Sequence, residues 1–151
     1  MAPVFRRAVA ADLPAIVALL ADDPLGAARE TSDIAAYRDA FASIDADPNQ
    51  YLCVLEDSGR VIGTMQLTFI AGLSRRGARR GQIEAVRIHR DHRGSGLGRR
   101  MILWAIGRCR SEGCTMVQLT TDRSREDAHR FYDSLGFVAS HLGYKLTLDQ
   151  V

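Results

Sequence analysis

A short glycine-rich run lies where the sequence pattern changes from strand to helix. Arg93-Gly-Ser-Gly-Leu-Gly98 follows a β-branched stretch and is followed at once by a helical pattern. Glycines allow tight turns that bring several main-chain N–H groups close to one ligand. The start of a helix adds unpaired N–H donors and the positive end of the helix dipole. The run therefore predicts a binding site for an anion such as a pyrophosphate.

Three glycine-loop patterns can be compared with this run. A dinucleotide fingerprint, G-x-G-x-x-G, would need glycine where Arg99 stands. A P-loop would need a lysine after its last glycine, but Lys145 is the only lysine in the chain. The pattern that fits is R-x-x-G-x-G, formed by Arg93, Gly96 and Gly98. A pattern with so few specified positions recurs by chance. The residues around it must therefore be used to identify the kind of site.

Those surroundings resemble the GCN5-related N-acetyltransferase (GNAT) family. The run Ile88-His-Arg-Asp-His-Arg-Gly-Ser-Gly-Leu-Gly98 is similar to the segment with which that family binds the pyrophosphate of acetyl-CoA through main-chain amides. Downstream, Ala128-His-Arg-Phe-Tyr-Asp-Ser-Leu-Gly-Phe137 is similar to the family's A-x-x-F-Y-x-x-x-G-F motif. The resemblance implies an enzyme that transfers the acetyl group of acetyl-CoA, as co-substrate, to a primary amine of a small molecule.

The resemblance also implies roles for single residues. Glu84 would be the general base that deprotonates the amine, and Tyr132 the general acid that protonates the departing thiolate. From the residues alone, Glu84 could instead balance nearby arginines, and Tyr132 could belong to a helix core. Strand alternation puts Glu84 on the face of Val86 and Ile88 unless a bulge intervenes. The residues expected to bind acetyl-CoA are Val86, Ile88, Arg93, Gly94, Ser95, Gly96, Leu97, Gly98, Arg99 and Arg125.

One of these positions departs from the family's pattern. Arg125 stands where many members have an asparagine that hydrogen-bonds the pantetheine arm of the cofactor. It is therefore expected to contact a cofactor phosphate, and it is not given the role of that asparagine.

Periodicity predicts the elements that must position these residues. A mixed α/β domain is expected, with one twisted sheet of about seven strands and about four helices, in the order β-α-α-β-β-β-α-β-α-β-β. Residues 1–151 would form this single GNAT-type acetyltransferase domain. In the family, the strands on either side of the glycine-loop helix separate to admit the pantetheine arm. The strands expected are Val4–Ala8, Tyr51–Glu56, Val61–Ile70, Gln82–Ile88, Met116–Thr121, Phe137–Ser140 and Tyr144–Leu148.

The helices are predicted from apolar stripes and breaker residues. Asp22–Ala28, with Pro24 and Gly26, is expected to interrupt the first helix, and Arg75–Arg80 is expected to be an exposed loop. The helices expected are Asp12–Ala21, Ser32–Ile44, Leu97–Arg110 and Ser124–Leu135.

Composition narrows the class of protein and its partners. The 151 residues include 46% hydrophobic and 25% charged residues, which is typical of one globular domain. No apolar run approaches the ~20 residues of a membrane span, so no membrane partner is expected. Three cysteines without C-x-x-C spacing indicate a reduced, cytoplasmic compartment. No metal is expected, because no set of ligands with metal-site spacing occurs.

Charge favours an anionic partner. Nine arginines lie between Arg75 and Arg100, opposed there only by Glu84 and Asp91. This cluster favours an acceptor amine that carries an acidic group, and without a DNA-binding motif it predicts no nucleic acid partner. The alternatives left open are a non-catalytic acyl-CoA sensor and an acetyltransferase of protein N-termini or lysines. The resemblance also allows a homodimer.

Overall fold

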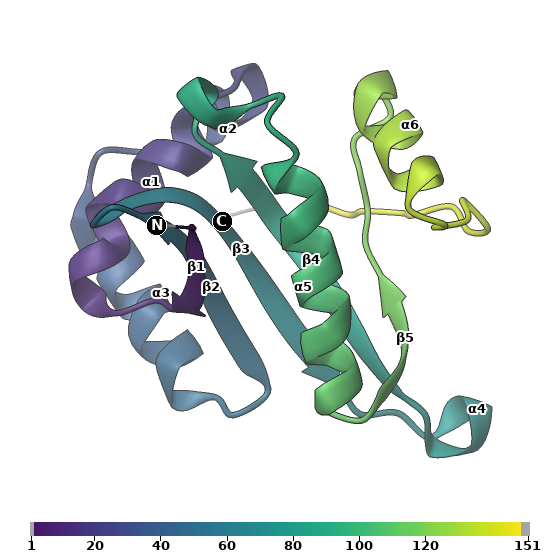
Figure 1. The fold of residues 1–151 in the computed structure, drawn as a ribbon. Helices are drawn as coiled ribbons and strands as arrows, with labels where there is room; N and C mark the ends of the chain where they lie inside the picture. The colour runs from purple at the N-terminus through teal and green to yellow at the C-terminus, as the bar shows by residue number, and fades with distance from the viewer. Residues whose placement is uncertain (1, 149–151) are drawn as a thin grey trace. The chain divides into compact units, whose positions relative to one another are not determined.

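The computed structural model describes residues 2–148 (Figure 1). Contacts divide the chain into two compact units, Met1–Gln118 and Leu119–Val151. The second unit contains one helix, α6 (Glu126–Ser134). The first unit contains, in chain order, β1 (Val4–Arg7), the 3-10 helix η1 (Ala10–Asp12), α1 (Leu13–Ala21), α2 (Pro24–Arg29), α3 (Ile34–Ala46), β2 (Gln50–Asp57), β3 (Arg60–Ile70), α4 (Ser74–Gly77), β4 (Arg79–Ile88), the 3-10 helix η2 (Arg90–His92), α5 (Leu97–Ser111) and β5 (Cys114–Gln118).

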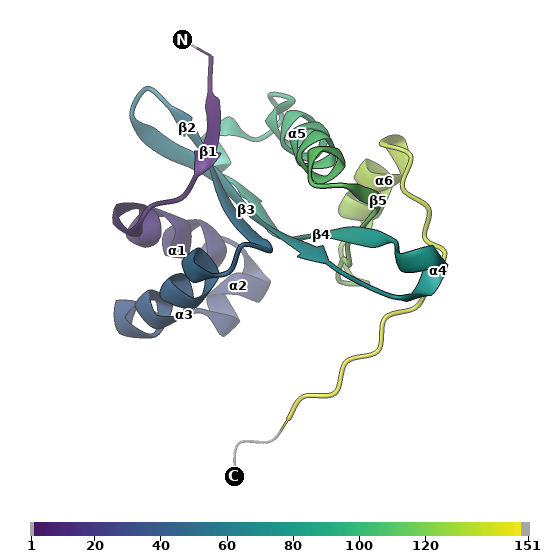
Figure 2. The same ribbon diagram turned by 90° about the horizontal axis from the view of Figure 1, so that it is seen from below.

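The first unit is built on a five-stranded sheet in the order β1-β2-β3-β4-β5. The first four strands are antiparallel to their neighbours, and β4 and β5 are parallel because α5 connects them. Helices α1, α2 and α3 lie on one face of the sheet and α5 on the other (Figure 2). The mixed α/β architecture expected from the sequence is confirmed. None of the described helices is long and apolar enough to cross a membrane.

Helix α5 packs against the sheet at very short range. A Cβ atom on Gly81 of β4 would overlap the sulfur of Cys109 on α5, and one on Gly63 of β3 would lie 3.2 Å from the sulfur of Met101. Met101 and Cys109 are fully buried. Burial raises the pKa of the Cys109 thiol to about 11, so this cysteine packs as a small apolar side chain. Two glycines on the sheet thus set how closely α5 approaches.

An ion pair fixes the chain between β1 and α1. Arg6 donates to both carboxylate oxygens of Asp12, at 2.8 and 3.0 Å, and the N–H of Val9 donates to the same carboxylate at 2.8 Å. The side-chain hydrogen bond from Arg6 holds the pKa of Asp12 below its usual range, although burial opposes it. Asp12 therefore stays ionised although it is buried.

The structure corrects the number of strands and helices. Residues 2–148 form five strands in place of about seven, because Phe137–Ser140 and Tyr144–Leu148 form no strand there. The same residues form six α-helices in place of about four. Asp22–Ala28 does end α1, but most of it belongs to α2: Pro24 occupies the first turn, and the Asp23 carboxylate accepts the N–H of Gly26 at 2.5 Å.

The prediction of an exposed loop at Arg75–Arg80 is also corrected, because a helical turn and the start of a strand occupy most of these residues. Residues Ser74–Gly77 form the short turn α4, in which Arg75 and Arg76 both have positive φ, and β4 begins already at Arg79.

Gly81→Ala should destabilise the protein by about 1–3 kcal/mol, because the new methyl group must displace α5 or the Cys109 side chain. Gly107→Ala is the control: it lies on α5 with nothing within 4 Å of its Cβ position, and it should stabilise by about 0.5–1 kcal/mol through helix propensity. Urea unfolding of the two variants measures both effects. Equal stability of both variants would contradict the close packing of α5 on β4.

Candidate functional site

The parallel ladder between β4 and β5 is short. It runs over four residue pairs, from Arg79↔Cys114 to Gln82↔Gln118, where β5 ends. Strand β4 continues for six more residues, Ile83–Ile88, which have no ladder partner on this side among the described residues. This side of the stretch forms no strand ladder, and two of its carbonyls accept side-chain hydrogen bonds instead: that of Val86 from Arg87 at 3.0 Å and that of Ile88 from Arg93 at 3.1 Å. A strand edge without a ladder can bind a ligand in extended conformation. This agrees with the separation of strands that the sequence resemblance implies.

A β-bulge interrupts β4 beside this free edge. Gln66 of β3 pairs with Glu84, and two positions earlier Thr64 pairs with Arg87, so Ala85 and Val86 together oppose one residue of β3. Ala85 has a φ of 55°, a left-handed conformation that is rare for a residue with a Cβ. The chain turns locally at the point where the β4–β5 pairing has just ended.

The bulge changes which side chains share a face. Glu84 lies on the face of its partner Gln66, whereas Ile88 lies on the opposite face, with its partner Gly63 and α5. A bulge does intervene, so the condition for Glu84 and Ile88 to share a face is not met, and the extra residue inverts the alternation. Glu84 itself is exposed, on the face that carries α1, α2 and α3.

The glycine loop leads directly into α5. Gly94 and Gly96 have φ values of 79° and 83°, which explains why glycine stands at both positions. The Ser95 hydroxyl donates to the carbonyl of His92 at 2.5 Å, and Arg93 Nε donates to the carbonyl of Ile88 at 3.1 Å. These bonds hold the loop against the end of β4.

The start of α5 presents main-chain donors. Gly96 is the N-cap residue, and the N–H groups of Leu97, Gly98 and Arg99 have no acceptor within the helix. Leu97 is buried and anchors the first turn, whereas Ser95 and Arg99 are exposed. The arrangement can bind an anion by N–H groups and helix dipole together.

Two ion pairs tie this region to the connection between α1 and α2. Arg93 lies 3.5 Å from Asp22, and Arg87 lies 3.0 Å from Asp23. Asp23 is also the N-cap of α2, and the Arg87 side chain is only 12% exposed. These ion pairs were not predicted from the sequence, although an acidic residue directly before Pro24 is a helix-start signal.

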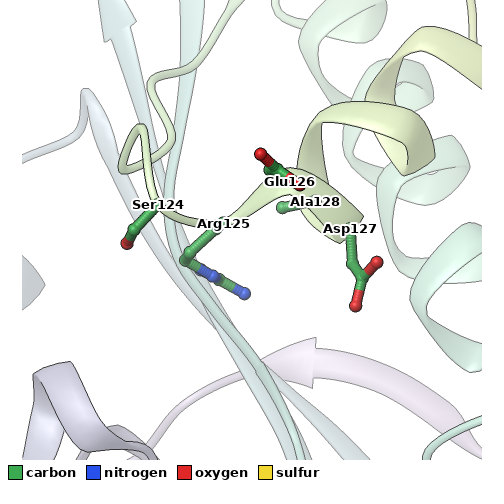
Figure 3. Close-up of a pocket in the computed structure, with 5 residues that line it drawn as sticks. All are labelled: Ser124, Arg125, Glu126, Asp127 and Ala128. Carbon is green, nitrogen blue, oxygen red and sulfur yellow. The ribbon is translucent and has the colours of Figure 1, made fainter.

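The second unit contains the remaining two predicted residues. The half-buried ring of Tyr132 packs edge-on against Phe131 and Phe137, with ring centroids 5.1 and 5.7 Å apart. Arg125 is exposed and is the N-cap residue of α6. It lines a pocket with Ser124, Glu126, Asp127 and Ala128, in which the Arg125 and Asp127 side chains extend to the same side of the chain (Figure 3).

The predicted site residues thus fall into two sets. The β4 residues and the glycine loop form one continuous stretch in the first unit, whereas Arg125 and Tyr132 lie in the second. Within residues 2–148, no three His, Cys, Asp or Glu side chains are grouped so that they could hold a metal ion.

Comparison with known proteins identifies the family. Residues 13–137 match the model of the acetyltransferase (GNAT) family. The chain belongs to this family. It is therefore an acyltransferase, and the family's co-substrate is acetyl-CoA.

Relatives and solved structures agree with this membership. The chain is 29% identical to an aminoalkylphosphonate N-acetyltransferase of Salmonella typhimurium over 95% of this chain and 90% of that protein. It is 34% identical to a glucosamine 6-phosphate N-acetyltransferase of Trypanosoma brucei brucei over 62% and 61% of the two chains. A crystal structure from Bacillus halodurans C-125, described as a transcriptional regulator, has 42% identity and a TM-score of 0.93 over 97% and 99% of the two chains.

Gly96→Ala should weaken the binding of coenzyme A about tenfold, because Ala at a φ of 83° costs about 1–2 kcal/mol and the loop will shift to relieve it. Gly59→Ala in the β2–β3 turn is the matched control, since Gly59 has a φ of 79° and equally open surroundings. Isothermal titration with coenzyme A compares the two variants. Equal affinities would show that the loop conformation is not needed for binding.

Proposed function

We propose that the protein transfers the acetyl group of acetyl-CoA to a primary amine of a small molecule that carries a phosphate or phosphonate group. The observation that carries this proposal is the glycine-capped start of α5, preceded by the β4 residues Ile83–Ile88, which lie beyond the end of the described β5 ladder. The start of α5 offers N–H donors for a pyrophosphate, and the β4 stretch offers main-chain groups for an extended chain that contains amides.

The cofactor-binding roles follow from these two features. The loop residues Arg93, Gly94, Ser95 and Gly96, with the first turn of α5 (Leu97, Gly98 and Arg99), would hold the pyrophosphate. The main chain at Val86 and Ile88 would hydrogen-bond the pantetheine arm, because this edge of β4 has no ladder partner. Arg125, whose side chain is exposed, would contact a phosphate of the cofactor.

Glu84 would act as the general base. An acceptor amine with a pKa of ~10 is an ammonium ion at neutral pH and must lose a proton before it can attack. The first proton passes from the ammonium ion to the Glu84 carboxylate, directly or through a water molecule. The neutral nitrogen then bonds to the thioester carbonyl carbon, the C–S bond breaks, and the nitrogen releases its second proton to solvent. Glu84 is suited to this role by its exposure and by its place next to the bulge.

Tyr132 would act as the general acid. The electron pair of the broken C–S bond stays on the sulfur, and the phenol O–H of Tyr132 would donate its proton to this thiolate. Ring contacts with Phe131 and Phe137 restrict the orientation of the phenol. A ring held in place gives up less side-chain entropy when it donates.

The acceptor class is argued from charge and from relatives. The two named relatives act on amines whose names include a phosphonate or a phosphate. Among the nine clustered arginines, six are exposed: Arg75, Arg76, Arg90, Arg93, Arg99 and Arg100. Arginine binds phosphate oxygens with two N–H groups at once, so such residues favour an acceptor with a phosphorus acid group.

DNA binding is the second candidate, favoured by the arginine cluster and by the description of the Bacillus halodurans relative. Against it, three arginines of the cluster are engaged within the first unit: Arg87 and Arg93 with aspartates, and Arg79 with the side-chain oxygen of Asn49 at 2.9 Å. Such internal pairing reduces the charge that is offered to phosphates.

We also propose that both units together make up one acetyltransferase domain, since the family match at residues 13–137 extends over the end of β5 into α6. The three cysteines are free and buried, which suits a reducing, cytoplasmic compartment.

A thiol-release assay with acetyl-CoA should give the highest kcat/KM for aminoalkylphosphonates or amino sugar phosphates, because the exposed arginines attract their anionic groups. The comparison set consists of matched amines without the acidic group, polyamines, aminoglycosides and lysine peptides. Equal turnover of anionic and cationic amines would contradict the acceptor assignment. Binding of acetyl-CoA without turnover of any amine would indicate a sensor, and a salt-dependent shift of random duplex DNA would support the second candidate.

Glu84→Gln should lower kcat about 100-fold at neutral pH, and this defect should shrink as the pH approaches the pKa of the acceptor, where the amine is already neutral. Tyr132→Phe should slow transfer without changing the affinity for coenzyme A. Glu112→Gln is the control, because Glu112 lies just after α5, far along the helix from the glycine loop, in an ion pair with Arg108. If both site variants kept wild-type rates, neither side chain would be needed for proton transfer, and catalysis would depend on positioning of the substrates alone.

A further inference from the structure

The sheet face that carries Glu84 becomes polar part-way along β3. Ile62 and Thr64 are buried on this face, and the Thr64 hydroxyl donates to the main-chain carbonyl of Cys53 at 2.9 Å. The next two residues of β3 on the same face, Gln66 and Thr68, are only half-buried. Polar side chains therefore begin where the close cover of this face ends.

Four glutamines from four neighbouring strands lie together on this part of the face. Gln66 of β3 is opposite Glu84 of β4, and residues that are opposite each other in a sheet share a face. One position further along, Thr68 connects the remaining three, because the register runs from Gln50 to Thr68, Gln82 and Gln118. We call Gln50, Gln66, Gln82 and Gln118 the amide cluster. It places neutral hydrogen-bonding groups beside the Glu84 carboxylate.

Hydrogen bonds within the amide cluster fix the orientation of Gln66. Gln50 Oε1 accepts from Gln66 Nε2 at 2.9 Å and from Thr68 Oγ1 at 3.0 Å. The NH2 group of Gln66 is thus used toward β2. Its carbonyl oxygen, Oε1, accepts no hydrogen bond within residues 2–118, although the side chain is half-buried. Gln66 therefore offers a fixed acceptor for a ligand.

Glu84 offers a second acceptor directly across the strand pair. Opposite residues of an antiparallel pair have Cβ atoms about 4.5–5.5 Å apart, so both side chains can reach the same small ligand. An ammonium nitrogen has several N–H groups and can lie about 2.8–3.0 Å from both oxygens at once. A hydroxyl group has a single O–H and can donate to only one of them. The pair therefore favours an amine over an alcohol.

We infer that Gln66 binds the acceptor amine, with its Oε1 accepting one N–H while the Glu84 carboxylate accepts another. This inference rests on the proposed function, because it takes Glu84 as the base. After Glu84 has received its proton, the amine keeps two N–H groups, and the bond to Gln66 holds the nitrogen at the site. Gln50 is a positioning residue, since it acts only through the amide of Gln66.

The first test is calorimetric titration of the full chain, saturated with coenzyme A. The two ligands are aminomethylphosphonate and methylphosphonate, which lacks the amine. Gln66→Met keeps an unbranched side chain but removes the carbonyl acceptor. It should weaken the binding of aminomethylphosphonate about tenfold, because a hydrogen bond from a charged donor is lost, and should leave the binding of methylphosphonate unchanged.

Thr68→Val is the matched control on the same strand. It removes the other hydrogen bond to Gln50 without touching the Gln66 carbonyl, so it should change neither affinity. If another amine has the highest kcat/KM in the thiol-release assay, that amine and its analogue without the amino group replace the two phosphonates.

The second test is kinetic. Gln66→Met should raise KM for the amine about tenfold with an unchanged affinity for coenzyme A. Gln50→Met should raise the same KM about threefold, because Gln66 keeps its carbonyl but loses its fixed orientation.

The outcomes separate this inference from the proposed function. If the wild type acetylates amines and Gln66→Met binds them equally well, the inference alone is overturned. An equal loss of affinity for both ligands would also overturn it, since it would mean a structural role. A wild type that acetylates no amine would overturn the proposed function, whereas a loss in Gln66→Met confined to the amine ligand would still support the ammonium site.

Discussion

The short pairing between β4 and β5 is the constraint on which the rest of the first unit depends. Parallel strands must be joined by a crossover, and here α5 fills that role, so both its ends are fixed by the sheet. Because β5 pairs with β4 only as far as Gln82, the second half of β4 forms its described strand ladder on the β3 side alone. The glycine loop begins just beyond this half-paired stretch. The sheet thereby supplies a row of main-chain groups and, next along the chain, a helix start.

The position of that helix start is set by packing at two points. Gly63 and Gly81 leave room for Met101 and Cys109, which lie eight residues, or about two turns, apart on α5. A change in either contact would tilt or lift the helix, and the N–H groups at its start would move with it. The ion pairs of Arg87 and Arg93 with Asp23 and Asp22 act at the same end, where they join β4 and the loop to the beginning of α2. Apolar packing thus holds α5 in place on the sheet, and the two ion pairs hold the end of β4 and the glycine loop in place.

The features that could be predicted from the sequence are those determined by residues close together in the chain. The glycine loop, the α5 helix and the order of the other elements up to α6, apart from the added helices α2 and α4, follow from turn glycines and apolar periodicity, and the structure has them within a few residues. Three features were missed for different reasons. Pro24 is read as a breaker, but after Asp23 it starts a helix. The bulge at Ala85 has no signal, because alanine does not favour positive φ and the bulge arises from the register between β3 and β4. The last two predicted strands have the right pattern, but a strand also needs an edge, which no single stretch of sequence supplies.

The stretch of β4 beyond the β5 pairing, Ile83–Ile88, also carries side chains that bear on what can bind there. It contains the exposed residues Glu84 and Ala85 and leads through η2 into the glycine loop. A small, polar and charged molecule can gain affinity at such a place from main-chain hydrogen bonds and from the dipole of α5. The half-paired strand and the helix start that follows it therefore favour the same kind of ligand.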